Sequence, residues 1–256
     1  MNNDFKCYLL DMDGTVYLGG KAVGGAAETV AKMRERGKVL FLTNNTSCSR
    51  RAYATKLSAL GIAAKEADIF TAGNATIDYI AENYSSPKVY VLGTELLKSE
   101  FAAAGLALVE SSPELVVVGF DTSLTYEKLS KTCAFIRGGV PFIATHPDFN
   151  CPVGDGYIPD VGSFLALIEA STGRRPEAVC GKPYAPMAKA LSKVTGASGR
   201  DVVMIGDRLY TDMRFAAENG FYSTLVLSGE ATKGELIESG IKVDRVIPSI
   251  KQFFDI

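Results

Sequence analysis

Two aspartates, Asp11 and Asp13, stand one residue apart where an apolar run ends and Gly14 follows. Such a run is typical of a buried strand, and glycine lets the chain turn sharply after it. The two charges repel each other, so a purely structural use for the pair is hard to find. A carboxylate can act as a nucleophile, a proton carrier or a ligand of a divalent cation. The pair therefore indicates a covalent reaction assisted by a divalent cation.

The composition excludes several functions. The 256 residues carry a formal net charge of −2, which does not favour nucleic-acid binding. No apolar stretch approaches the ~20 residues of a membrane span, and the first residues lack a signal-peptide layout. The five cysteines are scattered without CxxC spacing. We therefore expect reduced thiols, no structural zinc and a cytoplasmic protein.

The single histidine, His146, limits the chemistry further. A zinc site built on several histidines is excluded, and a Ser-His-Asp triad would have to use His146. The sequence contains neither a GxSxG elbow nor a GxxxxGK[ST] phosphate loop. Serine-hydrolase and P-loop nucleotide chemistry are therefore not favoured.

Apolar runs and helical stretches alternate along the whole chain. Strands are expected at 7–10, 39–42, 89–92, 115–118, 141–144, 179–180, 202–205 and 223–227. Helices are expected near 26–36, 50–60, 75–83, 95–104, 126–137, 163–172, 186–195 and 211–219. This alternation predicts an α/β fold, a parallel sheet with helices on both faces.

Polar segments follow several strands near the two ends of the sequence. They are Asp11-Met12-Asp13, Thr43-Asn44-Asn45, Gly181-Lys182-Pro183 and the segment from Gly206-Asp207 to Asp212. Because sites in open α/β sheets form beyond the carboxyl ends of strands, we expect these segments to meet. The strands in the middle of the chain are followed by other residues. We therefore predict a discontinuous core domain, 1–83 and 182–256, and an inserted domain, 84–181.

These four segments, in this order and approximate spacing, resemble the motifs of the haloacid dehalogenase superfamily. The long insert resembles the cap of its NagD-like branch, which includes phosphatases for p-nitrophenyl phosphate, phosphoglycolate and pyridoxal phosphate. The resemblance covers essentially the whole chain. It implies a Rossmann-like, doubly wound parallel sheet with an inserted α/β cap, and a phosphatase acting on small phosphorylated metabolites.

The resemblance gives each carboxylate a role. Asp11 would attack phosphorus and form an aspartyl-phosphate, and Asp13 would serve as general acid and base. Asp11, Asp207 and the backbone carbonyl of Asp13 would hold the metal, with Mg²⁺ as the cofactor. Asp212 would either orient a metal-bound water and pair with Lys182, or simply begin a helix.

Other residues are expected to bind phosphate. Thr43, Asn44 and Asn45 follow a strand where a hydroxyl and backbone N–H groups can hold phosphate oxygens. Lys182 would place a positive charge on the transferring phosphoryl group. The neighbouring Thr46 and Ser47 are expected to be ordinary helix caps.

The inserted segment would act as a lid that excludes water and selects the leaving group. His146 and Asp148 lie in a polar loop and are candidates for substrate specificity, although an ordinary hydrogen-bonded connection fits equally well.

The expected activity is Mg²⁺-dependent hydrolysis of a small phosphate ester such as a sugar phosphate, nucleotide or aryl phosphate. Alternatives are a phosphoryl-transferring mutase and a weakly active phosphometabolite-binding protein. Carbon–halogen cleavage is disfavoured, because dehalogenases of the family lack the second aspartate that is Asp13 here. Neither nucleic acid nor membrane is an expected partner. Association into a homodimer or higher homo-oligomer through the cap is left open.

Overall fold

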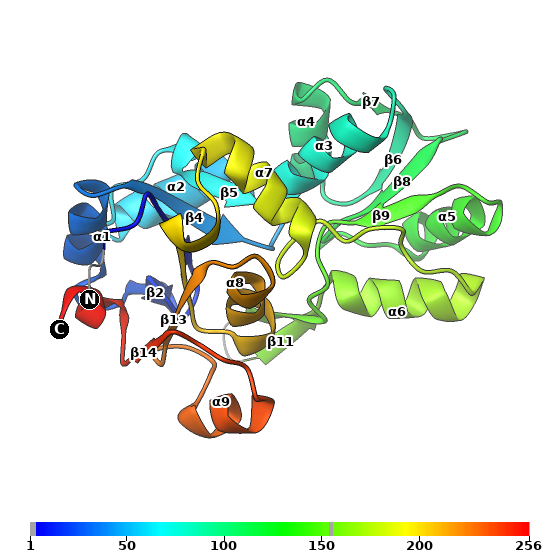
Figure 1. The fold of residues 1–256 in the computed structure, drawn as a ribbon. Coiled ribbons are helices and arrows are strands. Elements are labelled where there is room, and N and C mark those ends of the chain that lie inside the picture. The colour runs from blue at the N-terminus through cyan, green and yellow to red at the C-terminus, as the bar shows by residue number, and fades with distance from the viewer. Residues whose placement is uncertain (1–3, 154–155, 256) are drawn as a thin grey trace. The chain divides into compact units, whose positions relative to one another are not determined.

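The structure is a computed structural model that describes residues 4–153 and 156–255. Strands and helices alternate along the chain (Figure 1), as the apolar pattern predicts. The helices are α1 (Ala26–Arg34), α2 (Arg50–Ala59), α3 (Ala72–Asn83), α4 (Glu95–Ala103), α5 (Tyr126–Arg137), α6 (Val161–Thr172), α7 (Ala185–Thr195), α8 (Arg214–Glu218) and α9 (Lys233–Ser239). The strands are β1 (Cys7–Asp11), β2 (Tyr17–Leu18), β3 (Lys21–Ala22), β4 (Lys38–Thr43), β5 (Ile69–Thr71), β6 (Lys88–Leu92), β7 (Ala107–Leu108), β8 (Leu115–Val118), β9 (Phe142–Ala144), β10 (Asn150–Val153), β11 (Gly156–Pro159), β12 (Val202–Gly206), β13 (Tyr222–Val226) and β14 (Arg245–Ile247).

The larger sheet places β1 at its centre, in the order β14-β13-β12-β1-β4-β5. β1 pairs in parallel with β4 on one side and with β12 on the other. The chain therefore winds outward from β1 in both directions, which confirms the doubly wound α/β fold. The carboxyl end of β1, where Asp11 lies, is the switch point at which such sheets form their sites.

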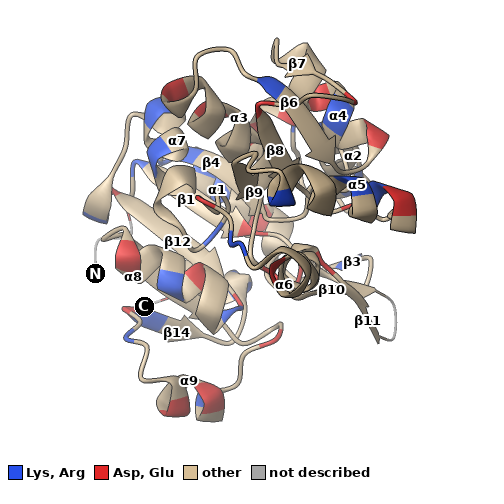
Figure 2. Cartoon of the chain, turned by 90° about the vertical axis from the view of Figure 1, so that its right-hand side faces the viewer, with Lys and Arg blue, Asp and Glu red and all other residues tan. Residues whose placement is uncertain are grey.

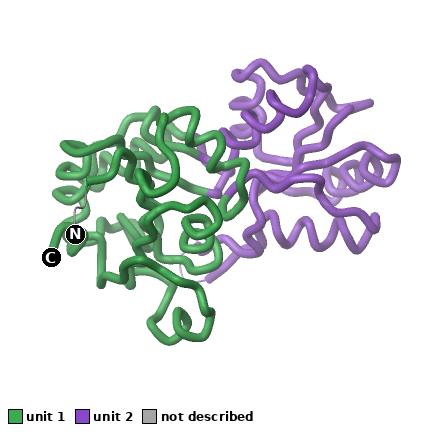
Figure 3. Tube along the Cα trace, in the orientation of Figure 1, with its two compact units in different colours: residues 1–43, 50–70, 182–256 green, residues 44–49, 71–181 purple. Residues whose placement is uncertain are grey.

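The chain divides into two compact units (Figure 3). Unit 1 comprises residues 1–43, 50–70 and 182–256, and unit 2 comprises 44–49 and 71–181. Unit 2 therefore starts earlier than the predicted boundary at 84 and gains a short segment after β4. One reason is that α3 packs against α4, so this helix joins the inserted segment rather than the core.

Unit 2 has a sheet of its own, in the order β7-β6-β8-β9 with parallel pairs throughout. The β8 sequence Leu-Val-Val-Val is buried at every position, as expected for a parallel strand covered on both faces. A separate antiparallel hairpin, β10–β11, follows the sheet in sequence. The apolar side chains of β6, β8 and β9 pack with α5 and α6 to form this unit's core.

Some sequence predictions of elements were wrong. Residues 179–180 form only an isolated bridge between Val179 and Ala144 rather than a strand of the sheet. The helix expected at 211–219 is a turn of π-helix, Leu209–Met213, followed by α8.

Among the described residues, no helix is long and apolar enough to cross a membrane. Basic and acidic residues occur together on helices such as α5 and α8 (Figure 2).

The start of α6 tests how closely this unit is packed. A Cβ atom added at Gly162 would lie 2.3 Å from the carbonyl oxygen of Pro147, a backbone atom that cannot move aside easily. Gly162→Ala should therefore lower the free energy of unfolding by about 1–3 kcal/mol, although alanine normally favours a helix. Gly234→Ala in α9 is the matched control, because its nearest contact would be at 3.8 Å. Equal melting temperatures for the two variants would contradict this packing.

Candidate functional site

A buried lysine of unit 1 contacts a residue from the N-terminal part of the sequence and another from the C-terminal part. The Nζ atom of Lys182 lies 2.5 Å from Asp11 Oδ1 and 2.7 Å from Asp212 Oδ1. The side chains of Lys182 and Asp212 are 3% and 0% exposed, and that of Asp11 is 15% exposed. The ammonium therefore fixes two carboxylates at once, one of them at the switch point of the sheet. The backbone N–H of Arg208 donates to the other oxygen of Asp212.

Asp207 directly follows β12 and is held by hydrogen bonds from two segments. The backbone N–H of Glu230 donates to its Oδ2 at 2.8 Å, and the Thr15 hydroxyl lies 3.5 Å from its Oδ1. The backbone at Gly14 and Gly229 lies very close to this carboxylate. A Cβ atom added at either position would lie within 2.2 Å of it. The absence of side chains at these two glycines therefore makes the position of Asp207 possible.

Asp13 lies in the turn after β1, where Gly14 adopts a φ of 77°. The backbone of Asp13 forms an isolated β-bridge with the backbone of Tyr17, and the Gly14 N–H donates to the Tyr17 carbonyl at 2.7 Å. Partial loss of hydration raises the pKa of Asp13, and the nearby charge of Asp11 adds to this while Lys56 opposes it. A raised pKa favours the protonated form that a general acid needs.

The electrostatics of the cluster follow from its burial. Burial, together with the charges of Asp11 and Asp212, raises the pKa of Asp207 from 3.8 to about 8. Burial also raises the pKa of Asp212, against the lowering effect of Lys182. For Lys182, burial alone would lower the pKa, but the carboxylates of Asp11 and Asp212 outweigh it and raise the pKa instead. Negative charge would therefore be in excess at this site if all three carboxylates were ionised.

The donor set fits a hard divalent cation. Carboxylate oxygens of Asp11, Asp207 and Asp212 lie within 4.8 Å of one another. Mg²⁺ prefers oxygen ligands and is usually bound by one or two carboxylates together with water and phosphate. A dication between Asp11 and Asp207 would offset the repulsion that disfavours ionised Asp207. Asp212 already contacts Lys182, which corresponds to the pairing alternative of the sequence analysis.

The expected phosphate-binding residues divide between the two units. Thr43 ends β4, beside β1 in the sheet, with Leu42 in register with Asp11. Asn44 and Asn45 follow directly but are grouped with unit 2. The Asn45 side chain accepts hydrogen bonds from the backbone and hydroxyl of Ser47, so it closes a local turn.

His146 and Asp148 lie in unit 2 and are buried. The ring nitrogens of His146 lie 2.9 Å from Thr145 Oγ1 and 2.9 Å from Asp160 Oδ1. Asp148 accepts a hydrogen bond from the Asn44 side chain at 3.0 Å. These contacts correspond to the hydrogen-bonded loop that the sequence left open as the alternative to a specificity site.

Several contacts of the site were missed from the sequence. Thr15, Gly229 and Glu230 all support Asp207, and the Arg208 guanidinium lies 3.1 Å from the Glu230 carboxylate. A usable signal existed, because the run Ser228-Gly229-Glu230 follows β13 at the same edge as the other polar segments. A polar loop with glycine after a parallel strand is a typical site element.

Comparison with known families gives matches to two models. Residues 8–107 match the model described as haloacid dehalogenase-like hydrolase. Residues 179–253 match a second model, of HAD hydrolase-like proteins. Together these segments cover most of the chain and include all four polar motifs.

Individual proteins are similar over nearly the full length. The chain is 33% identical over 250 residues to the 5'-nucleotidase YutF of Bacillus subtilis, covering 97% of each chain. A 4-nitrophenylphosphatase structure from Thermotoga maritima matches with a TM-score of 0.93 and 38% identity, over 97% of this chain and 96% of that one. A Mycobacterium tuberculosis glycerol phosphate phosphatase, solved with magnesium, matches with a TM-score of 0.91 and 29% identity, over 98% of this chain and 77% of that one.

Replacing the buried ammonium tests the electrostatic account. Lys182→Met should lower the free energy of unfolding by about 3–5 kcal/mol, because it leaves the carboxylates of Asp11 and Asp212 without their partner. Lys6→Met is the matched control, since the Lys6–Asp201 ion pair is exposed and should contribute less than about 1 kcal/mol. Chemical denaturation at neutral pH, without added metal, measures both. Similar losses in the two variants would contradict the account.

Proposed function

The chain belongs to the haloacid dehalogenase-like hydrolases, and we propose that it is a Mg²⁺-dependent phosphatase of small phosphorylated metabolites. The observation that carries this proposal is the contact of Lys182 with both Asp11 and Asp212 beside Asp207. A carboxylate nucleophile, a buried cationic side chain and oxygen ligands for a metal are together the requirements of phosphoryl transfer.

Asp11 is the proposed nucleophile. A carboxylate oxygen of Asp11 attacks phosphorus, the bond from phosphorus to the leaving oxygen breaks, and an aspartyl-phosphate forms. Asp13 donates its proton to the leaving oxygen. It then takes a proton from the water that attacks the aspartyl-phosphate, which releases phosphate and regenerates Asp11. The raised pKa of Asp13 supports the first of its two roles.

Mg²⁺ held by Asp11 and Asp207, with the backbone carbonyl of Asp13, would supply positive charge that screens the anionic nucleophile from the anionic phosphate. Lys182 adds a fixed positive charge beside Asp11 that favours the charge-rich transition state. Asp212 orients Lys182 through their 2.7 Å contact. The Thr43 hydroxyl and the N–H groups of Asn44 and Asn45 are proposed to bind phosphate oxygens.

The proposed substrates are sugar phosphates, nucleotides or aryl phosphates. The names of the similar proteins, a 5'-nucleotidase, a 4-nitrophenylphosphatase and a glycerol phosphate phosphatase, support a phosphomonoester without selecting one. A cytoplasmic location stays a prediction, as does association into a homodimer or higher homo-oligomer through unit 2. A mutase would return the phosphoryl group to its substrate, so release of inorganic phosphate from a substrate panel separates the two activities.

Asp11→Asn should reduce phosphate release from p-nitrophenyl phosphate by at least about 10³-fold, because an amide cannot act as the nucleophile. The variant should still fold, because Lys182 keeps its contact with Asp212, and circular dichroism checks this. Asp201→Asn, which changes an exposed carboxylate of the same unit, should leave turnover unchanged. Turnover of Asp11→Asn near the wild-type value would show that the nucleophile is another group.

The raised pKa of Asp207 predicts how pH affects the metal-free protein. The folded state holds this proton up to about pH 8, whereas the unfolded state loses it near 3.8. The resulting stability is full below about pH 4 and is lost as the pH rises through 8. Melting temperatures in EDTA should therefore show a fall between pH 5 and 8 that is smaller in Asp207→Asn, where only the other buried carboxylates such as Asp212 still titrate.

A metal ion binds a carboxylate in its ionised form. Mg²⁺ should therefore raise the wild-type melting temperature more at pH 8, where Asp207 is more ionised, than at pH 5. EDTA should also abolish phosphate release, and added Mg²⁺ should restore it. Full activity in EDTA, or an identical effect of Mg²⁺ on wild type and Asp207→Asn, would refute the assignment of this carboxylate.

A further inference from the structure

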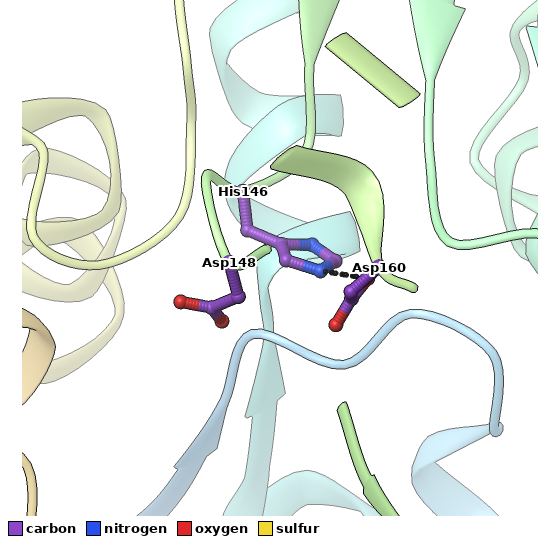
Figure 4. Close-up of side chains that lie close together, drawn as sticks. All are labelled: His146, Asp148 and Asp160. Carbon is purple, nitrogen blue, oxygen red and sulfur yellow. Dashed lines mark hydrogen bonds and ion pairs between the residues drawn. The ribbon is translucent and has the colours of Figure 1, made fainter. Parts of the chain in front are cut away.

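We propose that His146, Asp148 and Asp160 form a second divalent-cation site, inside unit 2, for a transition-metal ion such as Zn²⁺ or Mn²⁺. One ligand-type atom of each residue lies within 4.8 Å of the other two. All three residues are buried, with exposed fractions of 0%, 8% and 3%. Figure 4 shows the His146 imidazole between the side chains of Asp148 and Asp160.

The burial of two carboxylates favours a bound cation. Buried carboxylates are usually paired with a cation, because an unpaired charge loses its hydration without compensation. Asp121, another buried carboxylate of unit 2, follows this rule with Lys128 Nζ at 2.8 Å. Among the residues that the structure describes, no lysine or arginine forms an ion pair with Asp148 or Asp160, and His146 is the one basic side chain in contact. A dication would neutralise both carboxylates at once.

One carboxylate oxygen of Asp148 is also available to a cation. Asp148 Oδ2 accepts a hydrogen bond from Asn44 Nδ2 at 3.0 Å, but Asp148 Oδ1 is buried and has no hydrogen-bond partner within residues 4–153 and 156–255. Leaving such an atom unsatisfied costs about 1–3 kcal/mol, and more for a charged group. Coordination to a cation would satisfy this oxygen, while Asn44 continues to orient the carboxylate from its other side.

The hydrogen-bond partners of the His146 imidazole also suit a metal ligand. Metal-binding histidines usually donate their second ring N–H to a neighbouring acceptor, which fixes the ring. Thr145 Oγ1, 2.9 Å from His146 Nδ1, can accept that hydrogen bond. His146 Nε2 would then offer a lone pair only 2.9 Å from Asp160 Oδ1. With that tautomer the two atoms repel each other unless a cation binds both, and adjacent ligands of an octahedral ion lie about 3 Å apart.

The donor chemistry distinguishes this site from the one in unit 1. An imidazole nitrogen with carboxylate oxygens suits Zn²⁺ or Mn²⁺, whereas the three carboxylates around Lys182 suit Mg²⁺. A bound ion would also link two segments of unit 2. Asp160 caps α6 by accepting from the Val161 N–H at 2.7 Å, and the Gly162 N–H donates to the Asp148 carbonyl at 2.8 Å. The ion would therefore tie the loop of His146 and Asp148 to the start of this helix.

The single histidine makes a direct test possible. The experiment uses the full-length chain without an affinity tag, carrying Asp207→Asn to weaken the proposed unit 1 site. Zn²⁺ is titrated into the metal-free, ¹⁵N-labelled protein, and the imidazole nitrogens are followed by NMR. We expect the His146 Nε2 resonance to move to a metal-bound position with one equivalent of Zn²⁺. An imidazole that does not respond would overturn the proposal and show that His146 and Asp160 form only a hydrogen bond.

Calorimetry on the same background gives the second readout. Asp148→Asn should weaken Zn²⁺ binding by at least about tenfold, because an amide is a poor ligand of nearly the same shape. Asp121→Asn removes a buried carboxylate of the same unit that has its own lysine, so it should leave the affinity unchanged. Equal effects of the two variants would also overturn the proposal. Neither readout uses catalytic activity, so the result is independent of the proposed function.

Discussion

The burial of three carboxylates beside one lysine ammonium is the constraint on which unit 1 depends. Lys182 contacts Asp11 and Asp212 although it is far from both in sequence. Only a sheet that brings β1 and β12 side by side can collect these charges at one edge. The ammonium of Lys182 offsets part of this buried negative charge, and a proton on Asp207 or a bound cation would offset more of it.

Backbone segments without side chains make this concentration of charge possible. Gly14 and Gly229 leave room for Asp207, and Gly206 leaves room for Asp212, with Cβ positions that would fall 2.0 to 2.4 Å from carboxylate atoms. A larger residue at any of these positions would displace a charged group and not merely fill space. The same principle operates in unit 2, where Gly162 allows the loop after β9 to pack directly on α6. In both units close backbone packing holds buried carboxylates in place.

The sequence predicted the doubly wound fold, and the structure places several of the predicted site residues of unit 1 close together, for a physical reason. Asp11, Asp207 and Lys182 follow apolar runs or glycine, and the carboxyl ends of parallel strands must share one edge. Gly229 and Glu230 were not predicted: their position after β13 was a usable signal, but their backbone contact with Asp207 is visible only in the structure. The partnership of His146 with Asp160 was also not predicted. In sequence Asp160 is an ordinary helix cap, and only the packing of the loop against α6 brings the two together.

In the proposed mechanism Asp11 carries the phosphoryl group during turnover, and trapping that intermediate tests this role most directly. In Asp13→Asn the water that attacks the aspartyl-phosphate lacks its base, whereas p-nitrophenolate leaves without needing a proton. This variant, mixed with p-nitrophenyl phosphate and Mg²⁺ and quenched in acid, should therefore accumulate phosphoenzyme. Peptide mass spectrometry should find one phosphoryl group in the peptide that contains Asp11, attached to the side chain of that residue. Protein that carries no phosphoryl group, or carries one on any other residue, would contradict this role of Asp11.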